Sequence, residues 1–215
     1  MPTAALLFLD GLYIDRLREV PAWFWTADAI HFVVVPLATC GLLWRLYSIH
    51  PRDYGLGTLS GQRGPLVSLL VLGCVVLAFV VGLPVARDLA SLAPPIWRNQ
   101  SIAYGNALPD NLIGGVVALT YFSVTAGFVE EVFFRGLPFL YFSNKYPPRK
   151  ARYFYVVASS LAFSSIHWEG GSRQVIATLL LGIVVAWLYA RIRNLWPFVA
   201  GHALTDVLAI SGYYS

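Results

Sequence analysis

Six long apolar runs account for most of this sequence, and they restrict the chain to very few folds. They cover residues 29–47, 66–86, 112–142, 153–168, 175–190 and 197–212. Crossing the ~30 Å hydrocarbon core of a bilayer takes about 20 residues, and a backbone in lipid must satisfy its own hydrogen bonds, as a helix does. Because 58% of the residues are hydrophobic and only 12% are charged, we predict an all-α, polytopic transmembrane helical bundle of about six spanning helices.

The rest of the chain predicts one domain. Residues 3–14 are apolar, but the stretch is short, contains Asp10 and follows no basic leader. We therefore expect a re-entrant or interfacial helix there rather than a cleaved signal sequence. No internal repeat or long linker divides the sequence, so residues 1–215 should form a single integral membrane domain. The run 112–142 is longer than a bilayer requires and should tilt, kink near Pro138 or project from the membrane.

Basic residues concentrate in three connecting loops. Although the net charge is +4, this composition predicts a lipid bilayer as the partner of the chain and no nucleic acid. The nine cations that follow the first, third and fifth runs are Arg45, Arg52, Arg63, Lys145, Arg149, Lys150, Arg152, Arg191 and Arg193. By the positive-inside rule these loops lie in the cytoplasm and both termini outside, with Arg16 and Arg18 as the contrary signal.

Two adjacent acids, Glu130 and Glu131, interrupt the third apolar run. A carboxylate near the centre of a bilayer costs roughly 2.5–3.5 kcal/mol on insertion scales, so two together need partners or a function. Later runs contain candidate partners in His167, His202 and Asp206. Acids and imidazoles therefore recur where lipid-facing sequence should exclude them.

Three pairs have the i, i+4 spacing that places two side chains on one helix face. They are Glu131 with Arg135, Phe163 with His167, and His202 with Asp206. In the first pair Arg135 can neutralise Glu131, which leaves Glu130, about 100° around the helix, free to face another direction. Glu130 is therefore the better candidate for a general base.

The order of the segments should bring these groups together. Glu130 and His167 are nearly equidistant from the turn at Pro147 and Pro148, so they should lie at similar depths on neighbouring antiparallel helices. His202 follows soon after its run begins, and it would reach that depth if its helix started beneath the membrane surface. Glu130 and His167 could then activate a water molecule while His202 stabilises an oxyanion.

The same segments carry a family resemblance. The sequence reads Glu-Glu-Val-Phe-Phe-Arg at 130–135, Phe-Ser-Ser-Ile-His at 163–167 and His-Ala-Leu-Thr-Asp at 202–206. These segments resemble, in order, the EExxxR, FxxxH and HxxxN/D motifs of the CAAX-protease and bacteriocin-processing (CPBP) family of intramembrane endopeptidases. The resemblance covers about residues 112–212, which we interpret as the catalytic core.

The resemblance implies a glutamic-type intramembrane protease that needs no metal or other cofactor. Glu130 and His167 would activate water, and His202 with position 206 would form the oxyanion hole. Glu131, Arg135 and Phe163 would support the site. The implied substrate is a membrane-anchored protein or peptide, and some small relatives are thought to process carboxy-terminal sorting signals. A chain this short resembles the compact members of bacterial or archaeal cytoplasmic membranes.

One residue departs from the family pattern. Prenyl-protein proteases of the family have asparagine where this chain has Asp206. An ionised aspartate has no proton to donate to an oxyanion, so Asp206 should either be protonated or accept a hydrogen bond from His202 and orient it. The resemblance therefore does not imply that the substrate is prenylated.

Three other interpretations fit parts of the pattern. Glu130, His167 and His202 could form a His₂Glu zinc site with an open position for water, although no HExxH pair is present. A catalytically silent membrane scaffold or immunity protein could keep the same fold. A proton-coupled transporter could use the same acids and histidines, but it would be expected to show internal repeats and paired broken helices.

Overall fold

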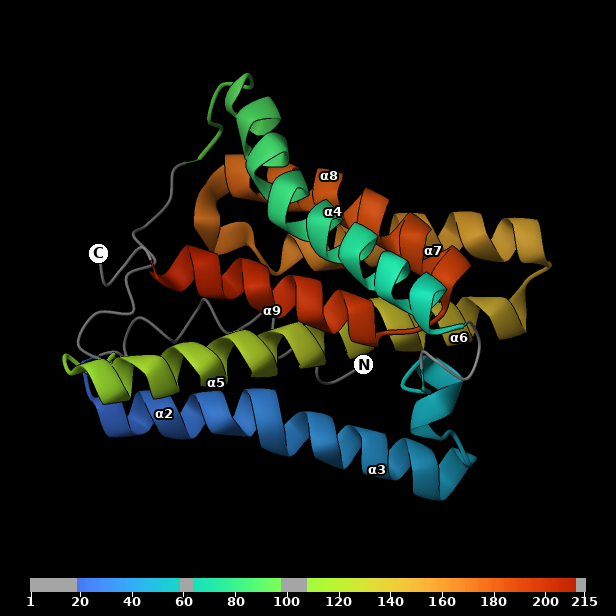
Figure 1. Ribbon diagram of the computed structural model, residues 1–215, viewed down its shortest axis with the longest axis horizontal. Helices are drawn as coiled ribbons and strands as arrows, with labels where there is room; N and C mark the ends of the chain where they lie inside the picture. The colour runs from blue at the N-terminus through green and yellow to red at the C-terminus, as the bar shows by residue number, and fades with distance from the viewer. Residues whose placement is uncertain (1–18, 59–63, 98–107, 212–215) are drawn as a thin grey trace.

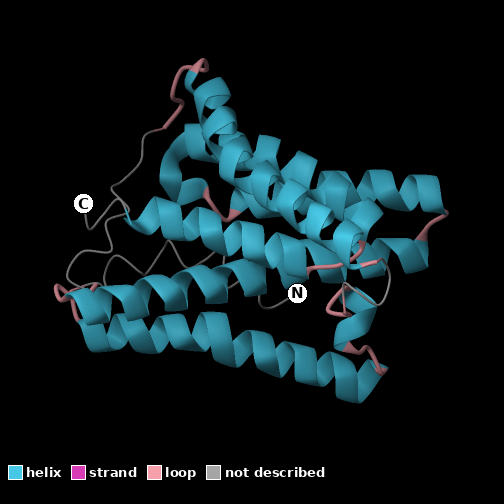
Figure 2. Ribbon diagram, viewed as in Figure 1, coloured by secondary structure: helices cyan, strands magenta, loops and turns pink. Residues whose placement is uncertain are grey.

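The computed structural model describes residues 19–58, 64–97 and 108–211, and every regular element in these ranges is a helix (Figure 2). This confirms the predicted all-α class. The elements are α2 (Pro21–Ala29), η1 (Ile30–Val34), α3 (Val35–Tyr47), η2 (Pro51–Tyr54), α4 (Pro65–Ser91), α5 (Leu112–Glu131), η4 (Val132–Gly136), α6 (Leu137–Lys145), α7 (Pro148–Ser165), η5 (Trp168–Gly170), α8 (Gly171–Ile192) and α9 (Trp196–Ser211). The predicted helix at residues 3–14 lies outside the described residues.

All six apolar runs form helices, and four helical stretches are long and apolar enough to cross a bilayer. These stretches are Pro21–Tyr47, Pro65–Ser91, Leu112–Lys145 and Trp168–Ile192. The two other helices, α7 and α9, are shorter, with 18 and 16 residues, and α7 begins with basic residues. Both pack against apolar stretches of the bundle, α9 against α4 and α5 and α7 against α8. The bundle therefore places its two shorter helices against its longer apolar ones.

Helix α9 packs against both α4 and α5, and α4 crosses it obliquely (Figure 1). Two glycines allow this close packing. A Cβ atom at Gly127 of α5 would lie 3.1 Å from the backbone nitrogen of Ala203, and one at Gly201 of α9 would lie 2.7 Å from the ring of Phe79. Small residues of this kind let membrane helices approach closely. As a result, the end of α5 that carries the two acids lies directly against the histidine-bearing part of α9.

The predicted irregularity near Pro138 is present as a π-helical segment just before it. Residues Val132–Gly136 form η4, and the helix resumes as α6 at Leu137. Pro138 has no N–H, so it cannot bond the carbonyl of Phe134 four residues earlier. The buried hydroxyl of Ser159 on α7 donates to that carbonyl instead. A side chain from another helix thus satisfies the backbone group that the proline leaves free.

The three basic loops gather at one end of the molecule, as the charge pattern predicted. The loops after the first and fifth runs are joined directly, because Leu195 N donates to Gly55 O at 2.8 Å and Asn194 Nδ2 donates to Gly57 O at 2.9 Å. The α6–α7 hairpin lies at the same end and extends past the start of α9 (Figure 1). Helix α9 therefore begins inside the bundle, which is the arrangement that brings His202 deeper.

Replacing Ser159 with alanine should leave the Phe134 carbonyl buried without a donor. We expect Ser159→Ala to lower the free energy of unfolding by about 1–3 kcal/mol, as for other buried polar groups that lose their partner. Ser143→Ala is the matched control, because the Ser143 hydroxyl is exposed and bonds its own helix at Leu140 O. Detergent unfolding curves would provide the comparison.

A second variant tests the role of the proline in the same loss of stability. In the double variant Ser159→Ala/Pro138→Ala, the alanine at position 138 restores an N–H for the Phe134 carbonyl. The double variant should therefore lose less stability than Ser159→Ala alone. If Ser159→Ala were no less stable than Ser143→Ala, the interpretation of this hydrogen bond would be wrong.

Candidate active site

The three motif segments meet around the imidazole of His202, which is 7% exposed. Its Nδ1 atom lies 2.8 Å from Glu131 Oε1. Its Nε2 atom faces two further carboxylates, 3.8 Å from Glu130 Oε2 and 3.7 Å from Asp206 Oδ2. Residues that lie 71 positions apart in the sequence, Glu131 and His202, thus contact each other directly.

Glu131 connects the two halves of the site. It is completely buried, as is Arg135, and its Oε2 atom lies 3.4 Å from Arg135 Nε while its Oε1 atom contacts His202. An ionised carboxylate only accepts hydrogen bonds, so the proton of this contact belongs to His202 Nδ1. The predicted pairing of Glu131 with Arg135 is present. The structure adds that the carboxylate also fixes the orientation of His202, leaving Nε2 to face Glu130 and Asp206.

Aromatic rings enclose the charged groups on both sides. Phe79 of α4 stacks on the His202 ring with centroids 5.6 Å apart and planes 25° apart, and Phe163 meets His202 edge-on at 6.0 Å. The Phe163 ring also lies 3.9 Å from the Arg135 guanidinium and 4.8 Å from the His167 ring. Phe163 therefore contacts three residues of the site, more than the support of His167 that its motif position predicted.

Phe79 was missed by the sequence analysis. It is a phenylalanine in a continuous apolar run outside the three motifs, and no sequence signal separates it from its lipid-facing neighbours. Only the rotation of α4 against α9 turns its ring, which is 1% exposed, onto His202.

His167 lies in the turn that follows α7 rather than within the helix. Its Nδ1 atom is 2.8 Å from the carbonyl oxygen of Phe163. The bond to a carbonyl requires the proton on Nδ1, which leaves Nε2 as an acceptor. Among the described residues, no ion pair within 4.0 Å joins a His167 nitrogen to a Glu130 carboxylate oxygen. The imidazole that approaches Glu130 directly is that of His202.

The carboxylate of Glu130 is poorly satisfied by the protein. Glu130 is only 7% exposed, yet its Oε2 atom accepts no hydrogen bond from the protein. A buried polar atom without a partner costs about 1–3 kcal/mol, more if it is charged, and native proteins keep few of them. Such an atom is expected where water or a substrate binds. Asp206 marks the more open side of the site, since its side chain is 27% exposed.

The connection that follows α4 is hydrogen-bonded to residues that follow His167. Trp97 Nε1 donates to Trp168 O at 3.0 Å, and Ile96 N donates to Ser172 Oγ at 3.0 Å. These bonds hold residues 92–97 against the start of α8, beside the turn that contains His167. The described part of this connection therefore lies next to the turn of His167, while residues 98–107 lie outside the described ranges.

A metal site is not preformed in the described part of the chain. Within residues 19–58, 64–97 and 108–211, no three His, Cys, Asp or Glu side chains converge as ligands of a metal ion would. The suggested zinc ligands include His202, whose Nδ1 is engaged by Glu131, and His167, whose Nδ1 is engaged by the backbone. Only the Nε2 atoms of these two rings remain to bind a ligand.

Comparison with known proteins finds a family model that matches the part of the chain carrying this site. Residues 112–208 match the model of a family described as "Type II CAAX prenyl endopeptidase Rce1-like". The match contains all three motif segments and confirms the predicted resemblance over nearly the predicted core. No curated protein and no solved structure matches the chain.

Removing the guanidinium of Arg135 should leave the buried charge of Glu131 without its cationic partner. We expect Arg135→Met to destabilise the protein by about 3–5 kcal/mol, the usual cost of breaking a buried ion pair. Arg191→Met is the control, since Arg191 is exposed and lies 4.0 Å from the Trp187 ring, so it also loses a cation–π contact. Unfolding in detergent would measure both.

The double variant Glu131→Gln/Arg135→Met removes both charges and should recover part of the lost stability. Equal stability of Arg135→Met and Arg191→Met would contradict a structural role for the ion pair.

Proposed function

We propose that this chain is a glutamic-type intramembrane endopeptidase of the CAAX-protease and bacteriocin-processing family, a proposal supported by the match of residues 112–208 to the Rce1-like endopeptidase family. The observation that carries this proposal is the position of Glu130. Its buried carboxylate has a free oxygen atom 3.8 Å from His202 Nε2, so a base and an oxyanion-stabilising group face the same space.

In this mechanism Glu130 accepts a proton from a water molecule, and the oxygen of that water attacks the carbonyl carbon of the scissile peptide bond. His167 positions the water through its unprotonated Nε2 atom. His202, protonated on both nitrogens, donates from Nε2 to the oxyanion while Glu131 holds Nδ1. Glu130 then transfers its proton to the leaving amine as the C–N bond breaks. No metal or other cofactor takes part in these steps.

The position of the site also supports a membrane-tethered substrate. The groups that perform the chemistry lie within a bundle whose outer stretches are apolar enough to cross a bilayer. A protein or peptide anchored in the same membrane would have its cleavage site held close to them, which replaces a bimolecular encounter by a local one. We propose such a substrate, with carboxy-terminal or sorting-signal processing as the kind of reaction, in a bacterial or archaeal cytoplasmic membrane.

Loss of the Glu130 carboxylate should abolish turnover without unfolding the protein. We expect Glu130→Gln to lower the cleavage rate of a membrane-anchored peptide by about 10²–10⁴-fold, the usual contribution of a general base. Asp88→Asn, at an exposed acid of α4, serves as the control and should cleave normally. Purified proteins in liposomes, assayed by mass spectrometry of the products, give the comparison.

A zinc chelator in the same assay separates the remaining possibilities. Activity that survives the chelator and disappears in Glu130→Gln supports the glutamic mechanism, whereas chelator-sensitive activity would support the zinc alternative. Cleavage by Glu130→Gln at the wild-type rate would refute the role proposed for this residue.

The carboxylate at position 206 should be replaceable by an amide. Asp206 Oδ2 lies 3.7 Å from His202 Nε2, on the side where the oxyanion would form. We expect Asp206→Asn to retain activity, because its amide can donate to the oxyanion. Asp206→Ala has no such donor, so its cleavage rate should fall about tenfold or more. If Asp206→Asn is as impaired as Asp206→Ala in the same assay, the carboxylate itself is needed to orient His202.

A further inference from the structure

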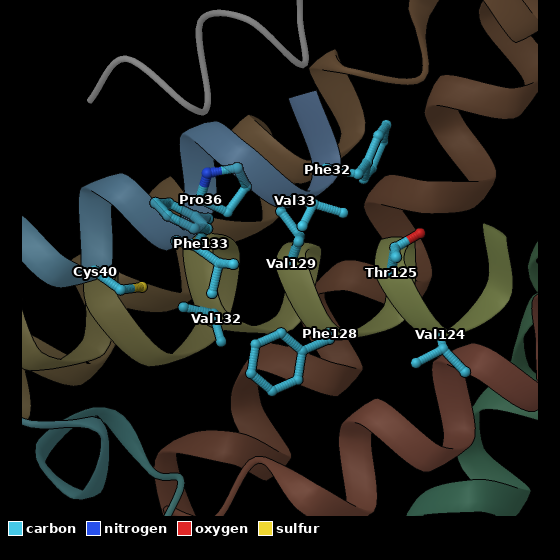
Figure 3. Close-up of a pocket in the computed structure, with 11 residues that line it drawn as sticks. Phe32, Val33, Pro36, Cys40, Val124, Thr125, Phe128, Val129, Val132 and Phe133 are labelled. Atoms are coloured by element: carbon cyan, nitrogen blue, oxygen red, sulfur yellow. The ribbon is translucent and has the colours of Figure 1, made fainter. Parts of the chain in front are cut away.

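A cavity of about 210 Å³ lies between the first spanning stretch and the third. Figure 3 shows side chains from both walls directed toward it: Val33, Pro36 and Cys40 from η1 and α3, and Val129 and Val132 from α5 and η4. Each wall contains one of the two π-helical segments, Ile30–Val34 and Val132–Gly136. Irregular turns of this type are often found at functional sites.

The first stretch is attached to the bundle on either side of this cavity. At one end, Trp25 stacks on Phe122 with centroids 5.0 Å apart, and Phe24 meets the same ring at 6.0 Å. At the other end, the chain continues into η2, where Tyr189 OH donates to Tyr54 O at 2.9 Å. Between these attachments the helix is poorly covered, since only 11% of its apolar window is buried in the protein. The cavity occupies this uncovered interval.

The described residues of the lining offer nothing to a polar ligand. Thr125 has a hydroxyl, but it donates to the carbonyl of Tyr121 on its own helix at 2.7 Å. The thiol of Cys40 is the other polar group of the lining, and a thiol is a weak hydrogen-bond donor. Apolar cavities of this kind stay dry, because water needs several polar partners to remain. The expected occupant is therefore a hydrocarbon.

The open side of the cavity faces lipid. Leu37 and Val124, which line the two walls, are 64% and 51% exposed, and both belong to stretches that are apolar enough to span the membrane. The hydrocarbon that reaches such an opening is the acyl chain of a neighbouring lipid. A helix of another protein, about 10 Å across, is too wide for the space.

The cavity is separate from the proposed reaction centre. Phe128 and Val132 line it and lie on one face of the helix, four residues apart. Glu130 is two positions from each, about 200° away, and contacts His202 on α9. We propose that this cavity is a binding site for one acyl chain of a bilayer phospholipid, which packs α3 against α5 behind the segment that carries the acids. The proposal does not depend on catalysis.

Photocrosslinking in liposomes tests this site. The full chain carrying Glu130→Gln is reconstituted in phosphatidylcholine that contains a diazirine in one acyl chain, and labelled residues are mapped by mass spectrometry. We expect labelling of Val33 and Cys40 to exceed that of Leu69 and Leu77, which are exposed side chains of α4 that do not line this cavity. Labelling of the cavity residues at or below the α4 level would overturn the proposal.

A matched pair of variants tests whether the cavity is the cause. Val33→Phe fills the space, so labelling of Cys40 should fall to the level of Leu69 and Leu77 on α4. Val34→Phe adds the same bulk at a neighbouring residue that is 57% exposed and lies outside the lining, so it should leave the excess unchanged. Excess labelling that persists in Val33→Phe would refute the assignment.

A measurement on unaltered residues covers the case in which Val33→Phe does not fold. Alkylation of Cys40 and Cys74 is followed in detergent with and without added phosphatidylcholine. Cys74 is exposed on α4, so it reports general lipid effects. We expect the lipid to slow the alkylation of Cys40 more than that of Cys74. Equal slowing, or protection of Cys40 only by a lipid-anchored substrate peptide, would exclude a phospholipid chain as the occupant.

Discussion

The rest of this structure depends on the two contacts that the completely buried carboxylate of Glu131 makes. It bonds His202 of α9 through one oxygen and pairs with Arg135 of its own helix through the other. Leaving either charge without its partner in such surroundings costs several kcal/mol. The position of α9, the rotation of α5 and the orientation of the central imidazole are therefore fixed together by one side chain.

The helices are arranged so that this charged group lies away from lipid. Three of the four stretches that are apolar enough to span a membrane, those containing α4, α5 and α8, lie against the two shorter helices α7 and α9, which contribute Phe163 and His202 to the site. Phe79 and Phe163 complete the enclosure with aromatic faces, which tolerate both a neutral and a charged ring beside them. In such a site, fixed dipoles act strongly because little water competes with them.

Departures from regular helix occur next to the functional features. The π-helical segment Val132–Gly136 directly follows the two acids and precedes Pro138, and Ser159 of α7 satisfies the carbonyl that this proline leaves free. The other π-helical segment, Ile30–Val34, forms part of the opposite wall of the apolar cavity. One irregular region of the third stretch thus borders both the charged site and the cavity.

The sequence by itself determined the helical class, the apolar stretches and the three motifs, because hydropathy and i, i+4 spacing depend only on local order. It also predicted the pair of Glu131 with Arg135, since both lie on one helix. The tertiary structure alone decided that Glu131 bonds His202, that Glu130 approaches His202 rather than His167, and that Phe79 stacks on the imidazole. Contacts between helices depend on their rotation and depth. These are set by close packing at Gly127 and Gly201, and periodicity along one helix contains no information about them.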